Sequence, residues 1–362
     1  MGSEAYMSLT YEIRNDKGNT IACVTGYEGS IKNLNIPEYM VTEKNDSGGG
    51  KIFEAAGTNK GVFDSSVKGE VNRIPVTEID NRAFASRNDI ETVTLTDKIR
   101  RIRPYAFHSC HQLHYLSLTD SVMDYYDGAI RQCKELQEVE IFFNKKNSFR
   151  LLKEVIGDGD AMIPVLIHFP VDDGMVTAAL TFPSYADNYE EDTFSRAFHE
   201  HIEGAGYVTR QLVTRTDIDF SGYDRLFSRF TYDEPASAVN AAFGRLMYPY
   251  RLSEEFRKQY EDYLRENSPE ILPKLIAGYD TPRFGHEGEL IWIPQDKTRT
   301  EERIRFMVEQ ELISEEALAP ALQMSAGEGA VTISAMLMDY QNRHFRKAYS
   351  GNGSSGPEMF EL

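Results

Sequence analysis

One pattern of apolar positions repeats three times, with a spacing of 23 residues, between Ile79 and Ile141. Each copy places a small residue and an apolar residue four and five positions after its start, as Ala83-Phe84, Ala106-Phe107 and Ala129-Ile130. A second apolar set follows in phase, as Ile90-x-x-Val93-x-Leu95, Leu113-x-x-Leu116-x-Leu118 and Leu136-x-x-Val139-x-Ile141. Because a period in the twenties is typical of stacked coils that share one core, the pattern predicts a short parallel β solenoid.

The segment before these coils predicts strands and a cap. Residues 10–14 and 20–25 are strand-like and flank the turn Asn15-Asp16-Lys17-Gly18, which favours a hairpin. Ile31-x-x-Leu34-x-Ile36 repeats the coil spacing once more, and a degenerate first coil is typical of a solenoid cap. Residues 42–50 are polar and rich in glycine, which predicts a loop.

The period ends after Ile141, and residues 150–220 predict a mixed α/β module. Apolar runs at 163–169 and 176–182 and the alternation at 207–213 indicate strands, and we expect residues 204–206 to form a hairpin turn before the last of these.

The pattern becomes helical from residue 221 to residue 348. Helix starts are indicated near residues 233, 253, 268, 300 and 314, where an oxygen-bearing side chain precedes an acidic residue or Pro. The pair 314–324 and 330–343 is typical of an ankyrin-like helical repeat. We therefore predict an α+β protein with a capped solenoid at 8–145, a mixed module at 150–220, a helical repeat region at 221–348 and a disordered tail at 349–362.

The solenoid motifs resemble the BspA-like (Treponema-type) leucine-rich repeat over residues 70–143. That resemblance implies that the Ala-Phe segment forms the outer turn and that the Leu-x-x-Leu-x-Leu segment forms the parallel strand. Arg87 stands where that family prefers Cys. Residues 180–345 are similar to a C-terminal region of bacterial leucine-rich-repeat proteins of uncharacterised role, through Phe182-Pro183-Ser184-Tyr185, Gly206-Tyr207, Tyr223-Asp224, Tyr248-Pro249-Tyr250 and Leu337-Met338-Asp339-Tyr340.

The charge balance narrows the class of partner. The chain has 57 acidic and 39 basic side chains and a net charge of -18, which disfavours nucleic acid and anionic membranes. We expect a cytoplasmic protein, because the start lacks the pattern of a secretory signal and no apolar run is long enough for a membrane helix. Cys23, Cys110 and Cys133 are expected to be small buried residues, with a bridge between Cys110 and Cys133 as the weaker alternative.

The outward positions of the strands are the candidate site. They alternate with the inward apolar positions, and the candidates for partner binding among them are Tyr115, Ser117, Glu138, Glu140 and Phe142. An ordinary solvated sheet face is an equally good interpretation. In the helical region, Tyr248 and Tyr250 could clamp a partner segment, although rings packed beneath the turn are favoured.

We find no positive signal for catalysis, metal or cofactor. His199, His201 and Glu203 share one side of a predicted strand but lack further ligands, and His108, Cys110, His111 and His114 are expected to point in different directions. Nucleophile elbows and phosphate-binding loops are absent from the sequence. The sequence therefore predicts a scaffold or adaptor that binds protein partners, with metal-binding or hydrolytic activity in the middle module and a surface adhesin as alternatives.

Overall fold

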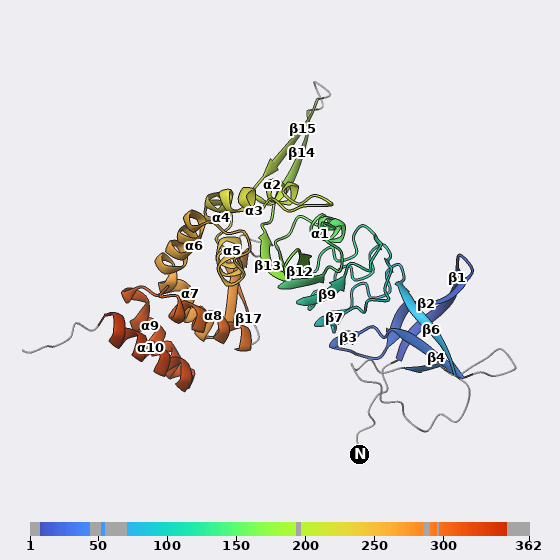
Figure 1. The fold of residues 1–362 in the computed structure, drawn as a ribbon, viewed down its shortest axis with the longest axis horizontal. Helices are drawn as coiled ribbons and strands as arrows, with labels where there is room; N and C mark the ends of the chain where they lie inside the picture. Colours follow the sequence, from blue (N-terminus) through green and yellow to red (C-terminus); the bar gives the residue numbers. More distant parts are fainter. Residues whose placement is uncertain are drawn as a thin grey trace, which may run out of the picture. The chain divides into compact units, whose positions relative to one another are not determined.

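The computed structural model describes residues 8–43, 52–54, 71–192, 197–284, 290–294 and 297–345 (Figure 1). The chain divides into two compact units, Met1–Tyr260 and Glu261–Leu362. The first unit contains the solenoid and the second contains a group of helices, and each is described by itself.

The N-terminal strands form a sheet that continues into the solenoid. Its order is β1 (Ser8–Asp16), β2 (Asn19–Glu28), β6 (Val71–Ile79), β4 (Tyr39–Glu43) and β5 (Ile52–Glu54). The predicted hairpin is confirmed as β1 and β2. On the solenoid side, β6 pairs in parallel with β8 (Arg101–Ile102), which pairs with β10 (Asp124–Tyr125).

The second sheet is formed by the predicted strands of the coils. Its order is β13 (Gly174–Phe182), β12 (Ile163–Val171), β11 (Glu138–Phe142), β9 (Tyr115–Thr119), β7 (Thr92–Thr94) and β3 (Asn33–Asn35), a row that can be followed in Figure 1. The strands from β3 to β12 are parallel, and β13 is antiparallel to β12. Leu34 is aligned with Val93, so the degenerate first coil is confirmed.

The apolar positions of the repeat form the solenoid core. Val93, Leu116 and Val139 are aligned across neighbouring strands and are at most 1% exposed. In the turns, the rings of Phe84 and Phe107 stack with 5.2 Å between centroids. The 23-residue period therefore arises because each inward side chain packs on its equivalent one coil away.

The cysteines are buried and free, as predicted. The thiol of Cys110 donates to the carbonyl oxygen of Phe84, and the thiol of Cys133 donates to that of Phe107, both at 3.1 Å.

Arg87, which stands in the Cys position of the first full coil, points to the cap. Its guanidinium lies 3.7 Å from the Tyr27 ring centroid and donates to the Gly29 carbonyl.

Helix α1 (Arg150–Ile156) interrupts the coils before β12 returns to the sheet. A hairpin, β14 (Ala186–Asp192) and β15 (Ala197–Glu203), follows β13. The strand predicted at 207–213 is wrong, because Gly206–Gln211 forms helix α2. The helix buries Thr209 and Arg210, and the Arg210 guanidinium donates to the backbone carbonyls of Ile156, Ala161, Pro183 and Gly206. Three of these carbonyls come from distant segments, and their contacts outweigh the local alternation.

Helices α3 (Phe220–Arg225), α4 (Phe227–Asp233), α5 (Pro235–Met247) and α6 (Glu254–Glu266) complete the first unit, and the boundary between the units falls within α6. The predicted starts near 233 and 253 are confirmed. A Cβ on Gly244 of α5 would lie 3.1 Å from the Cβ of Ala179 on β13, so helix and sheet are in close contact.

The second unit contains α7 (Ser268–Ile276), β16 (Tyr279–Phe284), β17 (Leu290–Pro294), α8 (Lys297–Glu309), α9 (Glu315–Gly327) and α10 (Val331–His344). The helices predicted from 268, 314 and 330 are confirmed, and α8 begins at 297 instead of 300. The hairpin of β16 and β17 was not predicted. The likeness to ankyrin repeats stays a prediction. The tail at 349–362 and most of the loop at 42–50 lie outside the described residues.

Candidate protein-binding face

The outward side chains of the parallel sheet lie in three rows, which we call the strand face. The rows follow from the strand registers, and they are Asn33, Thr92, Tyr115 and Glu138; Asn35, Thr94, Ser117, Glu140, Leu166 and Ala179; and Thr119, Phe142, His168 and Thr177. Four of the five candidates on the strands, Tyr115, Glu138, Glu140 and Phe142, are at least partly exposed, and Ser117 is buried at 6% exposure. The sheet therefore brings all five to one face.

A chain of hydrogen bonds crosses the strand face. The Tyr115 hydroxyl donates to one carboxylate oxygen of Glu140, and the other oxygen lies 2.8 Å from Nε2 of His168. Nδ1 of His168 lies 2.9 Å from the Thr177 hydroxyl. Burial and the bond to Glu140 raise the pKa of Tyr115, so its hydroxyl remains a donor at neutral pH. The network fixes polar side chains from four strands before any partner arrives.

Phe142 is the apolar element of this surface. Its ring stacks on the His168 ring with 4.5 Å between centroids and an interplanar angle of 10°, yet the residue stays 38% exposed. Because His168 is bonded on both ring nitrogens, it provides a fixed support for the phenyl ring. Phe142 is thus a preoriented aromatic side chain on an otherwise polar sheet.

Helix α5 closes the strand face at β13. Ala179 belongs to the second outward row, and α5 approaches it so closely that Gly244 has no room for a side chain without displacement. The accessible part of the face therefore extends from β3 to β12.

The two candidates of the helical region lie apart from the strand face. The Tyr250 ring packs edge-to-face on Phe169 and on Phe220, each at 5.3 Å, and its carbonyl accepts from Arg245. Tyr250 therefore packs beneath the turn, the interpretation that the sequence favoured. Tyr248 is half-buried.

The structure describes the side chains of one of the two metal candidates that the sequence analysis considered weak. Cys110 points into the coil core while His111 is exposed, so this cluster diverges as expected. The side chains of His199 and His201 lie outside the described residues. Among the side chains that the structure describes, no group of three or more His, Cys, Asp or Glu could hold a metal ion. Within the same limits, no helix is both long and apolar enough to cross a membrane.

Sequence reasoning missed His168 and Thr177, which complete the network. The signal for both was present in the alternation of residues 163–169 and 176–182, where His168 and Thr177 occupy the polar positions. The pairing of β12 with β11 was needed to place them beside Glu140, because the 23-residue period stops before this strand.

Comparison with known proteins supports the repeat assignment. Residues 60–150 match the model of the BspA type leucine rich repeat region, in six copies. No curated protein matches the chain. A solved leucine-rich repeat protein from Bacteroides ovatus is 18% identical, with a TM-score of 0.25 over 37% of this chain and 30% of that chain. The T. pallidum leucine rich repeat protein is 17% identical, with a TM-score of 0.20 over 36% of this chain and 68% of that one.

The family model covers the three full coils of the solenoid. The strands β7, β9 and β11 and the turns between them all lie within residues 60–150. The chain therefore carries a leucine-rich repeat region of the BspA type.

Proposed function

We propose that the protein is a binding scaffold and that the strand face docks a segment of a protein partner. Phe142 carries the proposal, because it is an exposed aromatic ring supported by a hydrogen-bonded histidine. Aromatic residues dominate the binding energy of protein interfaces, and a side chain that is already ordered loses little entropy on binding. Leucine-rich solenoids generally bind proteins, which agrees with this assignment.

The rows around Phe142 define the chemistry of the partner. Asn33, Asn35, Thr92 and Thr94 are polar, and Glu138 is the acidic member of the first row. Together with the net charge of -18, these side chains favour a segment with an apolar residue for Phe142 and basic or hydrogen-bonding residues beside it.

The size of the face favours a peptide or loop as the docked segment. Five strands from β3 to β12, at about 4.8 Å each, give a width of roughly 20 Å. That width fits an extended segment better than a large globular surface.

Affinity capture from lysate of the native cell tests the strand face. The full chain carrying Phe142→Ala and Thr94→Arg should retain about one tenth or less of the partner captured by the unchanged protein. Tyr126→Ala is the matched control, because Tyr126 is 42% exposed but lies outside the three rows. Equal recovery with all three proteins would contradict the proposal.

An adaptor would need a second docking surface, and α10 offers the best support for one. Val331 and Met338 are seven residues apart on this helix and are 78% and 54% exposed. The double variant Val331→Glu/Met338→Glu should lose a captured protein that the strand-face variant retains. Loss of the same set of proteins from both variants, or loss from neither, would argue against a second surface.

A further inference from the structure

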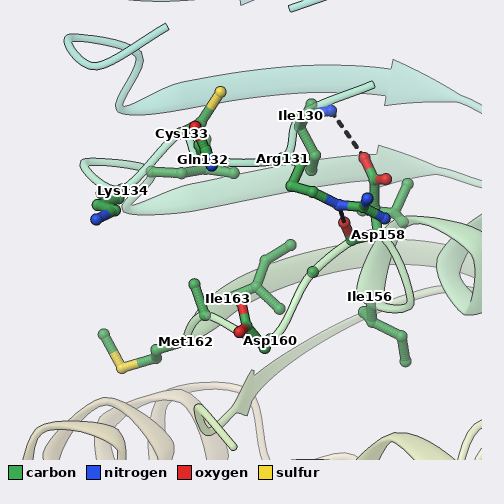
Figure 2. A pocket seen from close by; sticks show the side chains of 14 residues that line it. Ile130, Arg131, Gln132, Cys133, Lys134, Ile156, Asp158, Asp160, Met162 and Ile163 are labelled. Atoms are coloured by element: carbon green, nitrogen blue, oxygen red, sulfur yellow. Dashed lines mark hydrogen bonds between the residues drawn. The ribbon is translucent and has the colours of Figure 1, made fainter. Parts of the chain in front are cut away.

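A pocket of about 250 Å³ lies at the end of the third full coil. One wall is the turn at residues 130–134, and the opposite wall is the connection at residues 156–163 between α1 and β12 (Figure 2). The apolar part of the lining comes from Ile130, Leu136, Met162 and Ile163, among others. The pocket is formed by the turns and is separate from the outward rows of the strand face.

The backbone of the coil turns explains why space remains there. In the first full coil the N–H groups of Arg82, Phe84 and Ser86 donate to carbonyls of the second coil. In the second coil Tyr105, Phe107 and Ser109 donate in the same way to the third. Each turn therefore presents three donors to the next coil in the stack.

In the third coil a single side chain replaces the missing neighbour. The carboxylate of Asp158 accepts from the N–H groups of Gly128 at 2.5 Å and Ile130 at 2.7 Å, and Figure 2 shows the second of these bonds. It also accepts from the Tyr125 hydroxyl at 2.8 Å. Asp158 thus satisfies two of the three donors and leaves the position opposite the third donor, Gln132, to the pocket.

The N–H of Gln132 donates to no acceptor among the residues that the structure describes. Its equivalents, Ser86 and Ser109, both donate to a carbonyl at 2.8 and 2.9 Å. The carbonyl of Ile130 accepts from Cys133 N–H, but its equivalents in the other coils also accept a thiol from the next coil. The turn therefore presents one donor and one partly used acceptor next to the Asp158 cap.

Two polar side chains of the pocket, Arg131 and Cys133, are already bonded within the fold. Arg131 donates to the Asp158 carbonyl at 3.1 Å and pairs with Asp127 at 2.6 Å. The Cys133 thiol donates to the carbonyl oxygen of Phe107, towards the second coil. The apolar lining therefore suits an aromatic group accompanied by one backbone amide, and the charged residues Lys134 and Asp160 also line the pocket.

The volume of the pocket limits the size of the group that it can hold. An apolar cavity of roughly 150 Å³ is known to hold a benzene molecule, whereas small-molecule sites measure about 300 Å³ or more. A pocket of about 250 Å³ lies between these limits and has room for one aromatic side chain with its backbone.

We propose that this pocket docks one aromatic residue from a turn of a partner protein, beside the Asp158 carboxylate that ends the coil stack. One aromatic side chain of the partner fills the apolar lining, and one of its carbonyl oxygens accepts from the Gln132 N–H. The contact repeats the coil-to-coil interface that Phe84 and Phe107 form within the solenoid. The proposal is independent of the strand face and adds a binding site at the end of the array.

The chain itself supplies the probe for a test. A synthetic peptide of residues 102–109, with both ends blocked, carries the Ala106-Phe107 turn of the second coil. Titrated into the full-length ¹⁵N-labelled protein, it should shift the amide signals of Gln132 and Cys133 saturably. The same peptide with Phe107→Ala should bind at least about tenfold more weakly, because it loses a buried ring.

Filling the pocket should abolish this binding. Ala161 lines the pocket and is exposed, so Ala161→Trp places an indole there, and Ala161→Ser is the matched control. The tryptophan variant should lose the peptide-induced shifts and the serine variant should keep them. If circular dichroism shows that Ala161→Trp does not fold, Ala161→Leu replaces it. The proposal is overturned if no saturable shift occurs up to about 1 mM peptide, if shifts arise on the strand face instead, or if the filled variant binds equally well.

Discussion

At the scale of single residues, the coils depend on backbone conformations that most side chains avoid. Arg82 and Tyr105 have φ of 56° and 59°, and Gly128 occupies the same position of the third coil with φ of 73°. A second left-handed position follows four residues later in each coil, at Ser86, Ser109 and Gln132. Each of these residues other than Gly128 costs about 1–2 kcal/mol, so the hydrogen bonds between turns must offset a repeated strain.

Gly128→Ala should destabilise the first unit by about 2 kcal/mol or more. The new Cβ would lie 2.5 Å from the Tyr105 ring and would also force alanine into a positive φ. Gly18→Ala is the matched control, because Gly18 has φ of 89° but open space around it. Urea denaturation should show the larger loss for Gly128→Ala, and equal losses would mean that the contact with Tyr105 is unimportant.

The contribution of Asp158 to the stability of the first unit should fall as pH rises from about 4 to about 6. Burial raises the pKa of this carboxyl from 3.8 to about 6, against the bonds from Ile130, Tyr125 and Gly128 that favour the anion. In that window the native state holds a proton that the unfolded state has released, so unfolding becomes easier as pH increases. The effect amounts to about 3 kcal/mol, or 1.36 kcal/mol per pKa unit.

Asp158→Asn provides the comparison. Urea denaturation at a series of pH values should show a stability difference between the two proteins that shifts in favour of the variant from pH 4 to pH 7. Parallel pH profiles would show that the ionisation of Asp158 is not linked to folding.

At the scale of elements, sequence reasoning succeeded where an inward side chain of one coil packs on the equivalent side chain of the next coil. Val93, Leu116 and Val139 are inward because each lies on the next, and a period of 23 residues reveals this without a structure. It failed at α2, where Arg210 is buried and donates to three carbonyls from other segments and to one of its own helix. It also missed β16, because Tyr279–Phe284 contains Pro and charged residues that strands disfavour. The same holds for the candidate site. The outward positions on the repeat strands could be predicted from the period, whereas His168, which supports the Phe142 ring, lies on a strand beyond the period.

Helices α3, α5 and α6 are joined by one buried ion pair. Arg245 donates to both carboxylate oxygens of Asp224 at 2.7 and 2.9 Å, and Tyr260 donates to the same group at 2.8 Å. Arg245 and Asp224 are 0% and 1% exposed at their side chains. Removing one partner leaves a buried charge without its counterion.

Arg245→Met should therefore cost about 3–5 kcal/mol of unfolding free energy. The double variant Arg245→Met/Asp224→Leu should cost less than the single one, because the charge is removed together with its partner. Chemical denaturation of the three proteins measures this. A double variant that loses as much stability as Arg245→Met, or more, would show that the unpaired charge of Asp224 is not the cause of the loss.

At the scale of the whole molecule, the chain contains two units with separate cores. The first is built around the solenoid and the buried residues of α5, whereas the second is built around Ile271, Leu275, Leu318 and Leu337. Helix α6 contains the boundary and places Tyr260 in the core of the first unit. Units with separate cores are expected to unfold separately.

Calorimetry should show two transitions for the full chain. Arg245→Met lies in the first unit and Leu337→Ala lies in the second, where Leu337 is 0% exposed. Each variant should lower the midpoint of one transition and leave the other within about 2 °C, since loss of a buried leucine costs about 2–5 kcal/mol locally. A single transition that both variants lower would show that the units unfold together.

The carboxylate of Asp158 also decides how this array can grow. Inner coils are interchangeable, because each offers three N–H groups on one side and three carbonyls on the other. The last coil is already terminated by a side chain, and a further coil added after it would have to displace that group from Gly128 and Ile130. A duplicated coil of 23 residues would therefore meet matching N–H and carbonyl groups between two inner coils, whereas at the end of the array it would meet the carboxylate of Asp158. The number of coils can change in this way without any change to the closing residue.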